Sequence, residues 1–362
     1  MNAGGATAPR TARALRWALL ACAMSATLLA ATRAATPLTG VAAHRPVIAA
    51  ACPTCVWGPL AEIVKSALKP AGYEVQICYN CNLDDSPRYV AYARLPPPLT
   101  PHNVELGDLP PPQGPVDFGI TEVHFLEWLY EGTHQYAKDG PQHQLRLLAL
   151  IEDPVYLLVA VKADSGITDL AQLAGRHGLK VMSENDAWVQ PILERYHLTR
   201  AEVEAQGGAF SNPMALTKAS DFDVIVSGLG SLANNRESDV WYEMTTRFQL
   251  RFLPVPPDLL KRIASELGGE LVDVPVGYLR GLDRPIATVG RSGHAIFARA
   301  NLPEDFAYLV AKQLDEYQDL LKWAIRPFSY NPHSVWKAGP VPLHPGAARY
   351  YREVGYLHQS PP

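Results

Sequence analysis

Apolar residues recur along the chain in alternating strand-like and helix-like periods. Residues 46–50 form a short apolar run, and the segment that follows repeats apolar residues at helical spacing. The inward positions of this helix are Leu60, Ile63, Val64, Ala67 and Leu68. Gly72 ends the helix, and residues 73–78 supply a second strand. The segment therefore predicts a β-α-β unit with parallel strands and a right-handed crossover.

The alternation continues to the end of the chain in two groups. The first group continues with apolar strands at 116–120, 145–150 and 155–161. The second has strands at 179–182, 222–226 and 250–255, with helices near 187–196 and 259–267. Strand-like runs at 285–289 and 294–299 precede a long helix at 304–325. Two groups of β-α units predict an α/β protein with two sheets and a cleft between them.

A proline-rich segment interrupts the first group. Between Pro96 and Pro115, eight of twenty residues are proline. Such a segment can neither continue a helix nor donate to a sheet ladder. Because strand character resumes at Val116, we expect a surface insertion and not a domain boundary. A spacer without a function of its own is the simplest interpretation.

The first residues have the order of a secretory signal. Three arginines precede the uncharged stretch 17–32, which ends in small residues. We therefore expect residues 1–34 to be a signal peptide that is removed on export to the periplasm. A membrane anchor is the alternative, although this stretch falls short of the ~20 residues that a span needs. A lipoprotein cleavage box ending at Cys22 would leave a long apolar remainder after the cut.

The overall charge is balanced. The 362 residues contain 32 basic and 36 acidic side chains, giving a net charge of −4, and 48% are hydrophobic. This composition argues against a nucleic-acid binder with a basic face and against a disordered acidic chain. Without residues 1–34, 28 basic side chains remain against 36 acidic ones, a net charge of −8. We expect a soluble monomer with no nucleic-acid partner.

Four cysteines remain after the signal, in two Cys-x-x-Cys pairs separated by 22 residues: Cys52, Cys55, Cys78 and Cys81. An even number in an exported chain predicts disulfides. The loops after two parallel strands lie at the same sheet edge, so we expect Cys52 or Cys55 to approach Cys78 or Cys81, with the pairing open. A zinc site and a redox-active pair are alternatives. The long gap and the oxidising compartment argue against zinc.

Several segments carry a family resemblance. Residues 341–355, VPLHPGAARYYREVG, resemble the closing signature of the TAXI family, the extracytoplasmic receptors of some tripartite ATP-independent periplasmic (TRAP) transporters. Further similar segments lie at 163–175, 227–231, 288–290 and 301–308. In order and spacing, the resemblance covers most of the chain after residue 145. It is weak before that point.

The resemblance implies a type II periplasmic-binding-protein fold, in which two α/β lobes joined by crossover strands close on a small solute. The first lobe would comprise residues 36–161 plus 291–362, and the second residues 162–290. The crossovers would lie near 156–162 and 286–298. The implied partners are a small-molecule solute and the membrane components of a TRAP transporter. The resemblance implies no catalytic residues, no cofactor and no metal.

The expected ligand loops depart from the family pattern. Family members usually carry Gly/Thr-rich loops, whose backbone N–H groups hold a carboxylate. Here bulkier and more acidic residues stand at 51–57 and 183–188. Two tryptophans near acidic side chains favour a cationic or aromatic solute, unless they belong to the core. The candidate ligand-binding residues are Thr54, Trp57, Asn80, Thr121, Glu122, His124, Ser183, Glu184, Asn185, Asp186, Trp188, Ser227, Gly228, Leu229 and Tyr278.

No motif points to catalysis. The sequence has no nucleophile elbow, phosphate loop or His-x-x-x-His pair, and Gly228-x-Gly230 lacks the third glycine of a dinucleotide site. The expected function is the one that the resemblance implies, solute binding for transport. The alternatives are a periplasmic factor that uses the Cys-x-x-Cys pairs for thiol or metal chemistry, and a ligand sensor that signals to a membrane protein.

Overall fold

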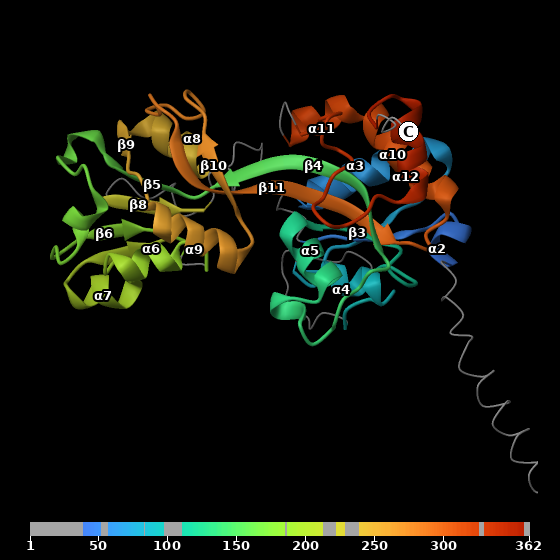
Figure 1. The fold of residues 1–362 in the computed structure, drawn as a ribbon, viewed down its shortest axis with the longest axis horizontal. Coiled ribbons are helices and arrows are strands. Elements are labelled where there is room, and N and C mark those ends of the chain that lie inside the picture. Colours follow the sequence, from blue (N-terminus) through green and yellow to red (C-terminus); the bar gives the residue numbers. More distant parts are fainter. Residues whose placement is uncertain are drawn as a thin grey trace, which may run out of the picture. The chain divides into compact units, whose positions relative to one another are not determined.

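The computed structural model is a mixed α/β chain with two sheets, as the hydrophobic pattern predicts (Figure 1). It describes residues 39–51, 57–82, 84–97, 111–184, 187–212, 222–228, 239–325 and 329–357. The expected signal peptide and most of the proline-rich segment lie outside these ranges. None of the helices within them is long and apolar enough to span a membrane.

The first sheet is built around three parallel strands. Its members are β1 (Val47–Ala49), β2 (Gln76–Cys78), β3 (Phe118–Glu122), β4 (Leu145–Tyr156), β10 (Glu270–Val274) and β11 (Ile286–Arg299). The order is β2-β1-β3-β11-β4, and β11 runs antiparallel to both of its neighbours. Strand β10 pairs with the first part of β11.

The second sheet repeats this order. Its members are β5 (Leu158–Lys162), β6 (Lys180–Met182), β7 (Ala209–Ser211), β8 (Val224–Ser227) and β9 (Leu250–Phe252). The order is β7-β6-β8-β5-β9, with β5 antiparallel to β8 and β9. The crossover strand is β11 in the first sheet and β5 in the second. When the other strands of each sheet are numbered in chain order, leaving β10 aside, both sheets have the order second, first, third, crossover, fourth. This is the type II periplasmic-binding-protein arrangement that the resemblance implies.

Helices cover both sheets and build separate cores. Helix α3 (Trp57–Leu68) joins β1 to β2 and buries all five of the predicted inward positions. Helices α10 (Glu304–Glu316) and α12 (Pro345–Glu353) add to the same core. The other α-helices are α2 (Thr39–Ala42), α4 (Ser86–Ala91), α5 (Val123–Glu131), α6 (Gln190–Arg195), α7 (Arg200–Ala205), α8 (Asp239–Arg247), α9 (Pro257–Leu267) and α11 (Gln318–Ala324).

The C-terminal signature has a structural role. The imidazole Nδ1 of His344 accepts a hydrogen bond from the backbone N–H of Gly346 and so caps α12. Pro345 follows in the first turn, where its missing N–H costs nothing. Gly346 lies so close to the backbone of Glu304 that any side chain would collide with α10. The sequence HPG therefore fixes how α12 begins and packs.

Several element boundaries differ from the predicted ones. The runs at 285–289 and 294–299 are one strand, β11, because pairing with β10 and β4 carries the ladder through the polar break between them. The run predicted at 155–161 instead divides at Leu157 between β4 and β5. The long helix predicted at 304–325 is two helices, which meet at Tyr317.

The ladder between β4 and β11 contains a bulge. Arg291 pairs with Val155 and Gly293 pairs with Glu152, so two residues of β4 face one residue of β11. Gly293 has φ +140°, and a side chain there would collide with the carbonyl oxygen of Ile151. Bulges bend strands and redirect side chains. This one lies beside Arg291, the central side chain of the site described below.

Candidate functional site

The carboxyl ends of three strands supply buried polar residues. Thr121 lies in β3, Ser183 directly follows β6, and Ser227 ends β8; all three are buried. Open α/β sheets bind ligands beyond the carboxyl ends of their strands. The residues that follow these three strands are therefore the natural place for a binding site.

Glu122 forms the main ion pair of this region. Its Oε2 accepts a hydrogen bond from Nη1 of Arg291 at 2.6 Å. Burial by itself would raise the pKa of the Glu122 carboxyl, but the charges of Arg291, His124 and His294 outweigh it and lower that pKa. Glu122 also stands at the N-terminus of α5, where a negative charge is favourable. The carboxylate is therefore ionised at neutral pH.

Arg291 connects the two sheets. Its guanidinium carbon lies 3.8 Å from the ring centroid of Trp188, which follows β6 in the second sheet, while its partner Glu122 ends β3 in the first. Trp188 is only 3% exposed. Its ring reaches Gly269, where an added Cβ would lie 3.2 Å from Cη2. The Trp188 face that could have received a solute is thus covered by the chain's own cation.

Glu184 forms a second internal contact. Its carboxylate accepts a hydrogen bond from the backbone N–H of Gly228, at the end of β8. An added Cβ at Gly228 would lie 3.3 Å from Glu184 Oε1 and 3.7 Å from Trp188 Cβ. A glycine at this position lets the carboxylate and the indole approach the backbone closely.

A cavity of about 120 Å³ adjoins Arg291, and His124, Glu127 and Glu270 contribute to its lining. His124 Nδ1 lies 3.3 Å from Glu122 Oε2. Burial, assisted by the charge of Arg291, lowers the pKa of His124 to about 4, so this imidazole is neutral near pH 7. Burial and the carboxylates of Glu270 and Glu131 raise the pKa of Glu127 to about 7.

A buried hydrogen-bonded chain lies next to the bulge. Nε1–H of Trp57 donates to Nδ1 of His294 at 3.1 Å, and Nε2 of His294 lies 3.1 Å from Oδ2 of Asp153. Because Nδ1 accepts from the indole, the neutral imidazole carries its proton on Nε2 and donates it to Asp153. The polar edge of Trp57 is therefore bonded to β11, and through His294 it is linked to Asp153 of β4.

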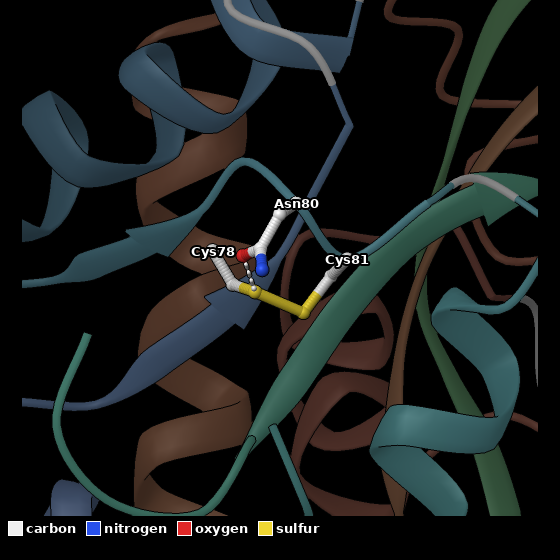
Figure 2. Close-up of a disulfide and its surroundings, with 3 residues drawn as sticks. All are labelled: Cys78, Asn80 and Cys81. Atoms are coloured by element: carbon white, nitrogen blue, oxygen red, sulfur yellow. Dashed lines mark hydrogen bonds between the residues drawn. A yellow bond between two sulfur atoms is a disulfide. The ribbon is translucent and has the colours of Figure 1, made fainter. Parts of the chain in front are cut away.

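Among the described residues there is one disulfide, and it lies within a single Cys-x-x-Cys pair (Figure 2). Cys78 is bonded to Cys81, with the Cα atoms 5.5 Å apart and both residues fully buried. The side-chain amide of Asn80 contacts the Cys78 sulfur, its Oδ1 3.2 Å away. This bond agrees with the expectation that Cys78 and Cys81 form disulfides, and of the pairings that the sequence left open it excludes those that link these two cysteines to the loop after β1. The turn after β2 already brings Cys81 within bonding range of Cys78.

The other two cysteines, Cys52 and Cys55, lie outside the described residues. Within the described ranges, no group of three or more His, Cys, Asp or Glu side chains is arranged to hold a metal ion. The four-thiolate zinc alternative is incompatible with the Cys78–Cys81 bond, because a disulfide sulfur is not a thiolate.

The structure brings some candidate residues together and separates others. Glu122 and His124 are in contact, as are Glu184 and Gly228, and Arg291 links Glu122 to Trp188. Tyr278 instead packs edge-on against Tyr156, with ring centroids 5.1 Å apart. Four candidates lie outside the described residues: Thr54, Asn185, Asp186 and Leu229.

Sequence reasoning missed three residues of this region: Arg291, His294 and Asp153. Arg291 had a usable signal, because it is a lone charged residue in the polar break Gly-Arg-Ser-Gly (290–293) between two apolar strand segments. A buried polar residue in such a setting is more informative than an exposed one. Asp153 and His294 had no comparable signal, since their pairing depends on the alignment of β4 with β11.

Comparison with known proteins gives one family and several distant structural likenesses. The model of the NMT1-like family matches residues 111–355. A Xanthomonas citri protein solved with a bound chloride ion is 15% identical, with 86% of this chain and 96% of that chain covered and a TM-score of 0.39. An ancestral cationic amino acid solute-binding protein is 9% identical, with 79% and 98% covered and a TM-score of 0.39.

A structure described as a periplasmic transporter is 12% identical, with 86% of this chain and 91% of that chain covered and a TM-score of 0.38. All three TM-scores lie below 0.5. These likenesses therefore say nothing about what this chain binds.

Proposed function

The chain belongs to the NMT1-like family, and from this membership and its two sheets of equal strand order we propose that it is an extracytoplasmic receptor that binds a small solute. One observation carries the proposal. Arg291 joins the carboxyl end of β3 in one sheet to the loop after β6 in the other. This is where a two-lobed receptor holds its ligand. We assign it no catalytic role.

The proposed movement is closure of two lobes, expected from the resemblance at residues 36–161 plus 291–362 and residues 162–290. Because β5 (Leu158–Lys162) belongs to the second sheet, we place the first boundary at Leu157. The backbone passes from β4 to β5 at Leu157, whose N–H donates to the Val289 carbonyl at 3.0 Å. The bulge beside Gly293 supports a hinge here, because it interrupts the ladder between β4 and β11. A few such residues can absorb the dihedral change of closure.

The proposed partner is the membrane part of a TRAP transporter, and the proposed location is the periplasm. The TAXI-like C-terminal segment 341–355 and the signal-like N-terminal segment 1–34 support these assignments. Proteoliposomes that carry the membrane subunits should accumulate solute only when the receptor is added. Accumulation without the receptor would contradict this partner. Capture of a membrane sensor in place of the carrier would favour signalling.

The first experiment is mass spectrometry of protein exported to an oxidising periplasm. A native spectrum should contain a small organic adduct, and a denatured spectrum should show the chain without its leader. A chain that retains residues 1–34 would contradict the proposed export. Protein without an adduct, and without a thermal shift across a library of small solutes, would contradict the receptor function.

The Cys78–Cys81 disulfide supports a competing function in thiol chemistry. Its full burial counts against that function, because an exchanging disulfide must be reached by an attacking thiolate. The double variant Cys52→Ser, Cys55→Ser separates the two. In this variant a receptor keeps its solute affinity, apart from an effect of lost stability. A factor whose thiol chemistry depends on Cys52 and Cys55 loses its activity.

A further inference from the structure

Two groups suited to binding an anion already hold carboxylates of the chain. The guanidinium of Arg291 pairs with Glu122 at 2.6 Å, and the backbone N–H of Gly228 donates to Glu184. Guanidinium groups and free backbone N–H groups are the usual partners of a bound carboxylate. An anionic solute would therefore have to displace Glu122 and Glu184, or bind beside them.

The charged residues that line the adjoining cavity also disfavour an anion. Of the described residues that line the adjoining cavity, Arg291 is the only arginine or lysine, against the glutamates at 127 and 270. His124 adds no positive charge near neutral pH, because burial lowers its pKa to about 4. Arg291 itself is already neutralised by Glu122. Glu270 and the ionised fraction of Glu127, whose pKa is raised to about 7, therefore leave the balance of charge in the region negative.

The placement of Arg291 shows which chemistry the region accommodates. Its guanidinium lies over the Trp188 indole at 3.8 Å and against the Glu122 carboxylate. An aromatic face together with a carboxylate stabilises an organic cation and repels an anion. Discrimination of this kind uses a repulsive element as well as an attractive one.

We propose that Glu122 and Glu184 set the charge specificity of the receptor, so that it takes solutes carrying an ammonium or guanidinium group and rejects dicarboxylates. This inference rests on the proposed solute-binding function and names its substrate class. Each carboxylate occupies an anion-binding donor and so closes it to a solute carboxylate. Because Arg291 already covers Trp188 and is neutralised by Glu122, a solute cation would bind beside this pair, towards the carboxylates that line the adjoining cavity.

Isothermal titration calorimetry of the exported, leader-free protein tests the proposal. The probes are L-arginine, agmatine and choline as cations, and L-malate, succinate and 2-oxoglutarate as dicarboxylates. We expect at least one cation to bind at least 100-fold more tightly than any dicarboxylate. The affinity for that cation should fall as ionic strength rises.

Substitutions test whether Glu122 and Glu184 cause the discrimination between cations and dicarboxylates. Glu122→Gln and Glu184→Gln keep the side-chain shape, and each should weaken cation binding by 10-fold or more while raising dicarboxylate affinity. The matched control is Glu266→Gln, which removes the same charge from an exposed pair with Arg262 on α9. It should change neither affinity by more than about twofold. Circular dichroism and thermal unfolding confirm that each variant is folded.

The outcomes separate this inference from the receptor function. A wild-type protein that binds a dicarboxylate more tightly than every cation overturns the charge specificity and leaves the receptor intact, whether or not the variants fold. Equal loss of cation affinity in Glu266→Gln and the site variants overturns the assignment to Glu122 and Glu184. Binding of no probe, together with a native spectrum without an adduct, overturns the receptor function and this inference with it.

Discussion

The indole N–H of Trp57 donates to Nδ1 of His294 across 3.1 Å, although the two residues are 237 positions apart in the chain. The contact ties the first turn of α3 to β11. It also fixes the imidazole tautomer, so that Nε2–H faces Asp153. Trp57, the last residue of one expected ligand loop, thereby orients a buried pair between β4 and β11.

Replacing this indole with a phenyl ring should destabilise the protein. Trp57→Phe keeps an aromatic ring but leaves buried Nδ1 without its donor, and we expect the free energy of unfolding to fall by about 1–2 kcal/mol. Urea denaturation measures the change. Trp323→Phe on α11, where the side chain is mostly exposed, is the control. Equal stability of Trp57→Phe and wild type would show that the hydrogen bond adds nothing.

The pair between Glu122 and Arg291 should be strongly coupled. Arg291→Met leaves a mostly buried carboxylate without its counter-charge and should cost about 2–4 kcal/mol of unfolding free energy. The double variant Glu122→Gln, Arg291→Met should recover part of that loss, because no unpaired charge remains. A double-mutant cycle measures the coupling. Strictly additive effects of the two substitutions would contradict a direct ion pair.

Glu127 should make stability fall as the pH rises. Its pKa is raised to about 7 in the folded state from 4.5, so between these values the folded chain binds more protons than the unfolded chain. The Glu127→Gln variant should therefore be more stable than wild type by about 1–3 kcal/mol at pH 8, with the difference gone near pH 4.5. Glu204→Gln on the surface is the control. Parallel stability curves for wild type and Glu127→Gln would contradict the raised pKa.

The bulge beside the proposed hinge should require its glycine. Gly293→Ala introduces a Cβ that collides with the Ile151 carbonyl oxygen and lies 2.7 Å from the Asp153 nitrogen, at a φ of +140°. We expect a loss of about 3 kcal/mol. Gly178→Ala is matched, because φ is also positive there but an added Cβ meets nothing within 4 Å. Gly178→Ala should lower the free energy of unfolding by only about 1 kcal/mol. Equal losses in the two variants would show that the positive φ, and not the collision with Ile151, causes the loss.

The disulfide should resist reduction until the chain unfolds. Cys78 and Cys81 are fully buried, so dithiothreitol followed by iodoacetamide should modify them only in concentrated urea. Mass spectrometry counts the modified cysteines. Because the bond closes a short loop, replacing both cysteines with alanine should cost about 2 kcal/mol. Rapid modification without urea would instead favour the thiol-chemistry function.

Local patterns in the sequence determined the fold class. The spacing of apolar residues predicted the buried face of α3, because that face depends on helical periodicity alone. Two groups of β-α units likewise predicted two sheets. The continuity of β11 was not predictable in this way, since its polar centre is held in the ladder by β4, a neighbour more than 100 residues away in the chain.

The sequence also identified acidic residues and tryptophans at the strand ends, among them Glu122, Glu184 and Trp188. Only the tertiary structure decided their partners. Arg291 comes from a strand that the chain reaches after the whole second sheet, and its contacts with Glu122 and Trp188 depend on the position of β11 beside β3. Periodicity encodes which face of an element is buried, whereas the neighbour of that face is set by how distant elements pack.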